Sequence, residues 1–133
     1  MKAIILITVL LFITSNTSLI NPAGTTIATR INVPKGYKRM ELDSTSFGYY
    51  LRNFPLKHHN STVYQYDGAE KYAQVYAAVL DIDVGTKDLQ QCADAVMRLR
   101  AEYLYKRKLY DKIHFNFTNG FIVEFKNGQK DTE

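Results

Sequence analysis

The chain opens with an apolar run that has no counterpart in the rest of the sequence. Eleven near-apolar residues, Ala3–Ile13, follow the positive charge of Lys2, and a small polar stretch begins at Thr14. This order is typical of a secretory signal peptide. A helix of this length rises only about 16 Å, far less than a bilayer core of about 30 Å. We therefore predict a signal peptide at residues 1–18 and no membrane span after its removal; an uncleaved N-terminal anchor is the alternative.

Apolar residues that recur at helical spacing predict two helices. A short helix is expected at about residues 46–53, because Ser44–Ser46 offers N-caps and Pro55 stops it. A long amphipathic helix is expected at about residues 87–106, where Asp88 and Gln91 resemble a capping box. The apolar stripe of this long helix consists of Leu89, Cys92, Val96, Leu99 and Tyr103.

Other segments have the composition and alternation of β-strands. Ile27–Val33 is predicted to be extended, and Val63–Tyr66 is predicted to be a strand that ends in a turn at Asp67–Gly68. Gln74–Val84 is rich in strand-forming residues, and apolar and acidic side chains alternate in its second half.

The C-terminal segment predicts a hairpin at residues 112–125 whose register can be argued from burial. A two-residue loop would place Phe115 opposite Glu124, whereas a three-residue loop with a left-handed Gly120 places Phe115 opposite Val123. The second register collects the apolar side chains on one face, which we expect to point to the core. It also places His114 beside Glu124 on the other face.

These elements predict an α+β fold with a small antiparallel sheet, in one domain that covers residues 19–133. Apolar residues make up 46% of the chain and charged residues 23%, which excludes a wholly disordered or collagen-like protein. The single Cys92 excludes an internal disulfide framework and a cysteine-rich zinc site.

Cys92 is also the first candidate for chemistry. A cysteine near the start of a helix can act as a nucleophile, and His114, oriented by Glu124, can act as its general base. The alternatives are a small apolar core residue at Cys92 and a solvent-exposed cross-strand pair at His114 and Glu124. We favour these structural interpretations.

No metal or cofactor is expected. His58–His59 has no evident third ligand, and Asp81 with Asp83 is explained by a solvated strand face. Phosphate-binding glycine loops, a Gly-x-Ser-x-Gly elbow and a His-Glu-x-x-His motif are missing from the sequence.

Basic residues outnumber acidic residues around the end of the long helix. Such a cluster is typical of a nucleic-acid-binding surface. An exported protein rarely meets nucleic acid, so we expect a solvated face or contact with the anionic cell envelope instead. The cluster contains Arg98, Arg100, Lys106, Arg107, Lys108 and Lys112, against Glu102 and Asp111.

Several motifs resemble a known family over about residues 30–125. The strongest are Asp88–Tyr105 (DLQQCADAVMRLRAEYLY) and Ile113–Gly120 (IHFNFTNG). The shorter ones lie at Arg30–Arg39, Ser46–Arg52, Pro55–Lys57, Tyr66–Gly68 and Val79–Gly85. Together they resemble the secreted or lipoprotein family catalogued as domain of unknown function 4846, which occurs mostly in Bacteroidetes-type bacteria. Family members are longer, so the resemblance implies that this chain is a C-terminally truncated member.

The family has no established activity, so the resemblance implies location rather than chemistry. We expect an exported protein, periplasmic, envelope-bound or extracellular, that has no catalytic activity and whose partners are envelope components. The alternative is a cysteine hydrolase of cell-wall peptides, by analogy with the NlpC/P60-type enzymes, with Cys92 as nucleophile and His114 as base.

Overall fold

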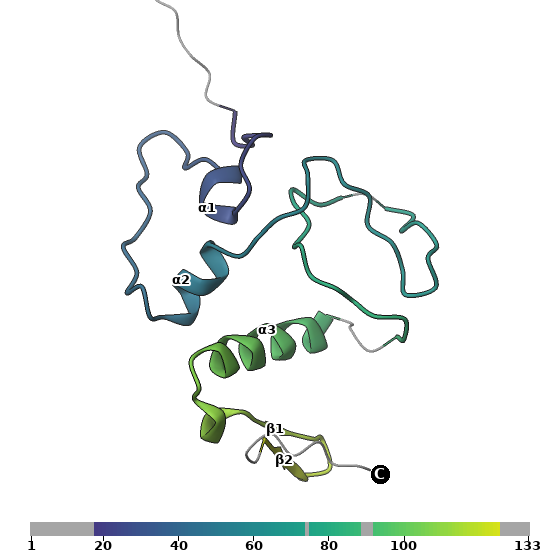
Figure 1. Cartoon of the computed structure of the whole chain (residues 1–133). Coiled ribbons are helices and arrows are strands. Elements are labelled where there is room, and N and C mark those ends of the chain that lie inside the picture. Colours follow the sequence, from purple (N-terminus) through teal and green to yellow (C-terminus); the bar gives the residue numbers. More distant parts are fainter. Residues whose placement is uncertain (1–17, 74, 89–91, 126–133) are drawn as a thin grey trace, which may run out of the picture.

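The computed structural model describes residues 18–73, 75–88 and 92–125 and confirms the α+β class (Figure 1). Residues 1–17 of the predicted signal peptide and the residues after Phe125 lie outside the described residues. The elements follow one another as α1 (Ile27–Arg30), α2 (Phe47–Arg52), α3 (Cys92–Lys106), the 3-10 turn η1 (Tyr110–Lys112), β1 (His114–Asn116) and β2 (Ile122–Glu124). Figure 1 shows α3 between α2 and the hairpin of β1 and β2.

Helix α1 occupies Ile27–Arg30 of the segment predicted to be extended, Ile27–Val33, and the prediction is wrong there; Ile31 is extended and forms a bridge with Ile20. The Thr26 hydroxyl accepts a hydrogen bond from the Thr29 amide, and the Thr29 side chain bonds back to the Thr26 amide. This reciprocal capping box starts a helical turn in spite of the β-branched residues. The turn places Arg30 in the interior, only 2% exposed, where Nε donates to the Gly24 carbonyl over 2.8 Å.

Helix α2 confirms the short helix predicted at residues 46–53. Ser46 is its N-cap, and the Ser46 hydroxyl accepts a hydrogen bond of 3.1 Å from the Tyr49 amide. The backbone of Asn53 ends the helix ahead of Pro55. Because Phe47, Tyr50 and Phe54 are three and four residues apart, their rings share the side of α2 that meets α3.

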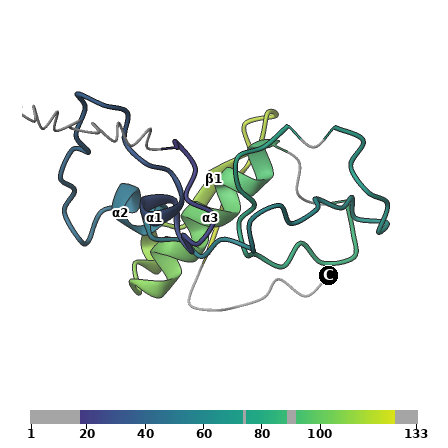
Figure 2. The ribbon, with the colours of Figure 1, turned by 90° about the horizontal axis from the view of Figure 1, so that it is seen from above.

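Residues 57–88 form a wide excursion on one side of the molecule, visible in Figures 1 and 2. The strands predicted at Val63–Tyr66 and Gln74–Val84 do not form in the described part of this segment, where only isolated bridges occur. One bridge pairs Leu56 with Leu80, and another pairs Tyr64 with Glu70 around the predicted turn at Gly68, whose φ is 84°. Strand-forming residues alone do not make a sheet when no neighbouring strand continues the ladder.

Helix α3 confirms the long amphipathic helix but begins later than residue 87. Residues 86–88 are bends, and residues 89–91, which include the predicted capping partner Gln91, lie outside the described residues. The helix ends at Lys106, followed by Lys108 with a left-handed φ of 58°. Its buried residues are Leu99, at its middle, and Leu104, in its last turn.

The hairpin forms in the predicted register. His114 pairs with Glu124, Phe115 with Val123 and Asn116 with Ile122, and the φ of Gly120 is 85°. The expectation that its apolar face is buried is only partly met: Ile113, just before β1, is buried, but Phe121 is 62% exposed.

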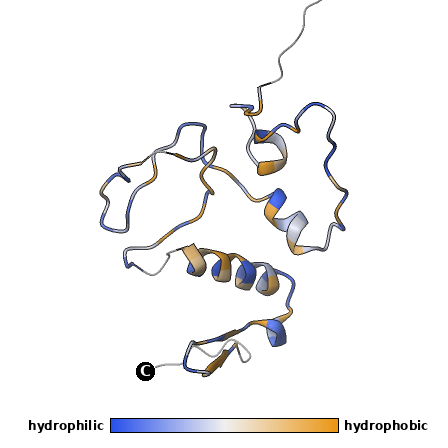
Figure 3. Ribbon diagram, turned by 180° about the vertical axis from the view of Figure 1, so that it is seen from behind, coloured by the Kyte–Doolittle hydropathy of each residue, from blue (hydrophilic) through white to orange (hydrophobic). Residues whose placement is uncertain are grey.

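The buried apolar residues come from sequence-distant segments around α3. They are Phe54, Leu56, Leu99, Leu104 and Ile113. Figure 3 shows hydrophobic and hydrophilic stretches alternating along α3, as expected of a helix with one packed side. Among the described residues no helix is long and apolar enough to cross a membrane.

Candidate functional site

Cys92 is the first residue of α3 and is exposed, so its interpretation as a core residue is wrong. The stripe that includes it is not buried over its whole length, because Val96 is 60% exposed whereas Leu99 is 8% exposed. Periodicity identifies one side of a helix, but only the part that meets another element is covered. The rings of α2 meet α3 near Tyr103, more than two turns beyond Cys92.

His114 lies on the exposed edge of β1, opposite Glu124 as predicted. Among the described residues, no hydrogen bond connects the side chain of Cys92 to that of a histidine. The roles of Cys92 as nucleophile and His114 as base stay predictions.

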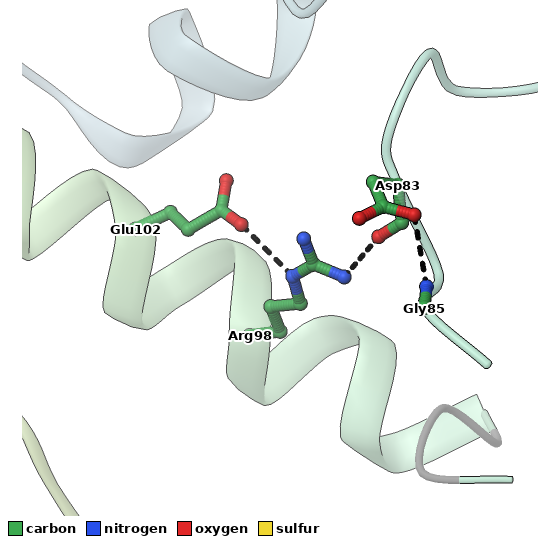
Figure 4. A network of polar contacts seen from close by, with 4 residues as sticks. All are labelled: Asp83, Gly85, Arg98 and Glu102. Carbon is green, nitrogen blue, oxygen red and sulfur yellow. Dashed lines mark hydrogen bonds and ion pairs between the residues drawn. The ribbon is translucent and has the colours of Figure 1, made fainter. Parts of the chain in front are cut away.

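Asp83 has a local structural role. Its carboxylate accepts a hydrogen bond of 2.9 Å from the Gly85 amide, and its carbonyl accepts one from Arg98 (Figure 4). Arg98 also pairs with Glu102 over 2.9 Å, one helical turn further along α3. Arg98 thus connects the end of the excursion to α3. The described residues contain no cluster of three metal-ligating side chains.

A concave site among the described residues is a cleft between α2 and α3, which we call the α2–α3 cleft. Its volume is about 520 Å³, within the range of about 300–1,000 Å³ that is usual for small-molecule sites. Aromatic rings, hydroxyl groups and two cations surround it. The lining residues are Ser44, Thr45, Ser46, Tyr49, Tyr50, Asn53, Phe54, Pro55, Tyr103, Lys106 and Arg107.

Contacts between distant residues hold this cleft in shape. The Tyr103 hydroxyl donates a hydrogen bond of 2.6 Å to the Thr45 carbonyl, 58 residues earlier in the chain. Arg107 donates to the same carbonyl, and its guanidinium lies 5.8 Å from the centroid of the Tyr103 ring. The loop before α2 is therefore fixed to the last turn of α3.

Tyr50 lies at the centre of the aromatic wall. Its ring centroid is 5.5 Å from those of both Phe54 and Tyr103, and the Lys106 ammonium lies 5.2 Å from it. The Tyr50 hydroxyl is buried without a hydrogen-bond partner among the described residues. Burial of the phenol, followed by the nearby Glu102 carboxylate, raises the pKa of Tyr50 above its ordinary value.

Asp43, just outside the cleft, lies in a different environment. Its carboxylate accepts hydrogen bonds of 2.6 Å from both the hydroxyl and the amide of Thr45. These bonds, and to a smaller extent the Arg107 charge, lower the pKa of Asp43 below its ordinary value. Asp43 is therefore an anion that shapes the loop at Thr45.

The sequence pattern does not predict the α2–α3 cleft, although it does mark some of the residues that line it. The spacing of Phe47, Tyr50 and Phe54 marked one aromatic side of a short helix, and Lys106 with Arg107 belonged to the basic cluster. Nothing in the spacing indicated that these two sets of residues meet.

Comparison with known proteins places the chain in a family. No curated protein and no solved structure matches it with significant similarity. A family model described as domain of unknown function (4846) matches residues 27–132, which include all the helices and strands of the structure. The chain therefore belongs to the family of domain of unknown function 4846.

Proposed function

We propose that this protein is exported to the cell envelope of a Bacteroidetes-type bacterium and has no catalytic activity of its own. The observation that carries the export is the N-terminal order of Lys2, the apolar run Ala3–Ile13 and the polar residues from Thr14. Resemblance to a secreted or lipoprotein family supports the same location. Envelope components are its proposed partners.

The thiol geometry supports the non-catalytic part of the proposal. A thiol hydrolase needs a base within hydrogen-bond reach of its sulfur, directly or through one water. Cys92 lies at the start of α3 and His114 on β1, and no hydrogen bond between described residues links the two side chains.

Fractionation of bacterial cells tests the export. We expect the full chain, tagged at its C-terminus, to be recovered from the envelope or periplasm as a product about 18 residues shorter. Leu10→Arg interrupts the apolar run and should leave the uncleaved chain in the cytoplasm. The matched control is Val75→Arg, at a side chain that is 88% exposed, which should be exported normally. Equal cytoplasmic retention of the wild type and Leu10→Arg would contradict the proposal.

A cysteine hydrolase of cell-wall peptides is the second candidate, and the exposure of Cys92 at the start of α3 is the observation in its favour. Labelling by iodoacetamide separates the two functions. The non-catalytic function predicts that labelling increases only in the alkaline range where ordinary thiols ionise, and that His114→Gln does not change it. Rapid labelling at neutral pH that His114→Gln slows, together with peptide cleavage that Cys92→Ala abolishes, would establish the hydrolase instead.

A further inference from the structure

The α2–α3 cleft presents aromatic faces that are fixed before any ligand arrives. The Tyr103 ring is held by its hydrogen bond to the Thr45 carbonyl, and its centroid lies 5.2 Å from that of Phe47. Tyr49, also on the lining, is exposed and has no ring–ring contact with a described residue. Aromatic faces carry partial negative charge and attract the weakly positive C–H groups of a saturated ring. The wall therefore suits the apolar face of a sugar.

Two cations lie at this wall without an ion pair to a described residue. Lys106 and Arg107 contact the faces of Tyr50 and Tyr103, and none of the lining residues is acidic. The nearest carboxylates are already engaged, since Asp43 binds Thr45 and Glu102 binds Arg98. A carboxylate on a ligand would therefore meet two cations, neither of which forms an ion pair with a described residue.

Polar groups are also present on the lining beside the rings. The hydroxyl of Ser44 and the side-chain oxygen of Asn53 form no hydrogen bond with a described residue, whereas the Asn53 amide nitrogen donates to the Tyr49 carbonyl over 2.9 Å. A purely apolar ligand would leave these groups unpaired on binding, and a sugar brings hydroxyl groups that pair with them.

From these three features we propose that the α2–α3 cleft is a binding site for an acidic sugar, a carboxylate-bearing pyranose. The pyranose ring lies on the exposed ring of Tyr49, its carboxylate lies near Lys106 and Arg107, and its hydroxyl groups pair with Ser44 and Asn53. The site goes beyond the proposed function and stands on the cleft alone, whether or not the chain is exported.

Titration of the full chain with small ligands, followed by NMR chemical shifts, tests the site. D-glucuronate is the probe, D-glucose has the ring without the carboxylate, and acetate has the carboxylate without the ring. We expect glucuronate to bind about tenfold more tightly than either, because only it uses both the rings and the cations. Binding should weaken as salt is added, since Lys106 and Arg107 are exposed. N-acetylmuramate is a second acidic sugar, which carries its carboxylate on a side ether. Whichever of the two acids binds more tightly shows which type of acidic sugar the site prefers.

Variants test the contribution of each part. Lys106→Gln should weaken glucuronate about tenfold and leave glucose unchanged, whereas Lys112→Gln, which removes a charge outside the cleft, should change neither. Tyr49→Ala should weaken both sugars, and the matched control Tyr37→Ala, at an exposed tyrosine outside the cleft, should weaken neither.

Three results would overturn the proposal. These are no binding of either acidic sugar, binding of glucuronate no tighter than that of glucose or acetate, and equal losses in Lys106→Gln and Lys112→Gln. Because the measurement uses purified protein, none of them bears on where the protein is located.

Discussion

The two sides of α3 each carry a tyrosine, and the two tyrosines make different contacts. Tyr103 and Tyr105 are two positions apart, which places them about 200° apart around the helix. Tyr103 faces α2, where its hydroxyl is bonded to a carbonyl 58 residues away. Tyr105 faces the hairpin side, where its ring meets Tyr110 and Phe125 at 5.3 and 5.8 Å.

The difference between the two sides is the sequence distance that their contacts span. The Tyr103 side joins residues from both halves of the chain and buries Phe54 to 6% exposure. The Tyr105 side joins residues within about twenty positions; it buries Ile113 but leaves Tyr105 itself half exposed. Contacts between residues far apart in the sequence cost more chain entropy than local contacts do. They therefore need more buried surface to offset that cost. The Tyr103 side should therefore carry most of the stability.

Truncation of one phenylalanine on the Tyr103 side and of one in the hairpin gives the largest expected effect. Phe54→Ala should lower the free energy of unfolding by about 4 kcal/mol, since it removes a buried ring from the aromatic wall. Phe121→Ala, the matched change in the hairpin at 62% exposure, should cost about 0.5 kcal/mol. Urea denaturation followed by circular dichroism measures both, and equal losses would show that the two sides share the stability.

The same distinction explains what the sequence could predict. The hairpin register followed from local features, a left-handed Gly120 and the apolar pairs Phe115–Val123 and Ile113–Phe125. Helix α2 followed from its cap at Ser46. These features act within a few residues, so the chain itself displays them.

Features that depend on distant partners were not predictable. The exposure of Cys92 depends on how far α2 reaches along α3, and the cleft depends on the meeting of Tyr50 with Tyr103. The missing strands of residues 57–88 show the same dependence, because a strand needs a neighbour. Helix α1 is an exception, because its signal is local and was still missed. Its capping box is made by Thr26 and Thr29, whereas the usual pattern has Glu or Gln at the second position.

Removal of a hydroxyl from each tyrosine gives a smaller and sharper test. Tyr103→Phe keeps the ring but leaves the Thr45 carbonyl with Arg107 as its remaining described donor, so we expect a loss of about 1 kcal/mol in the free energy of unfolding. Tyr105→Phe should change it by less than about 0.3 kcal/mol, because the Tyr105 hydroxyl bonds to no described residue. Thermal denaturation at neutral pH measures both, and a larger loss in Tyr105→Phe would reverse the comparison.

Tyr50→Phe should have the smallest effect at neutral pH and a clear one in alkali. The Tyr50 hydroxyl is buried without a described partner, so its removal should leave the free energy of unfolding at pH 7 almost unchanged. Burial raises the pKa of Tyr50, so above about pH 10 the unfolded state releases the phenol proton first. The unfolded state then binds fewer protons than the folded state, and the stability of the wild type decreases as the pH rises.

Tyr50→Phe lacks this proton, so its stability should decrease less steeply than that of the wild type as the pH rises above about 10. Tyr105→Phe is the control for the loss of any tyrosine hydroxyl, and denaturant titrations at each pH measure all three proteins. Parallel pH profiles for wild type and Tyr50→Phe would mean that water reaches the Tyr50 hydroxyl as freely as it does in the unfolded chain. The Tyr103 side of α3 would then be the more open of the two, and its larger share of the stability would need another origin.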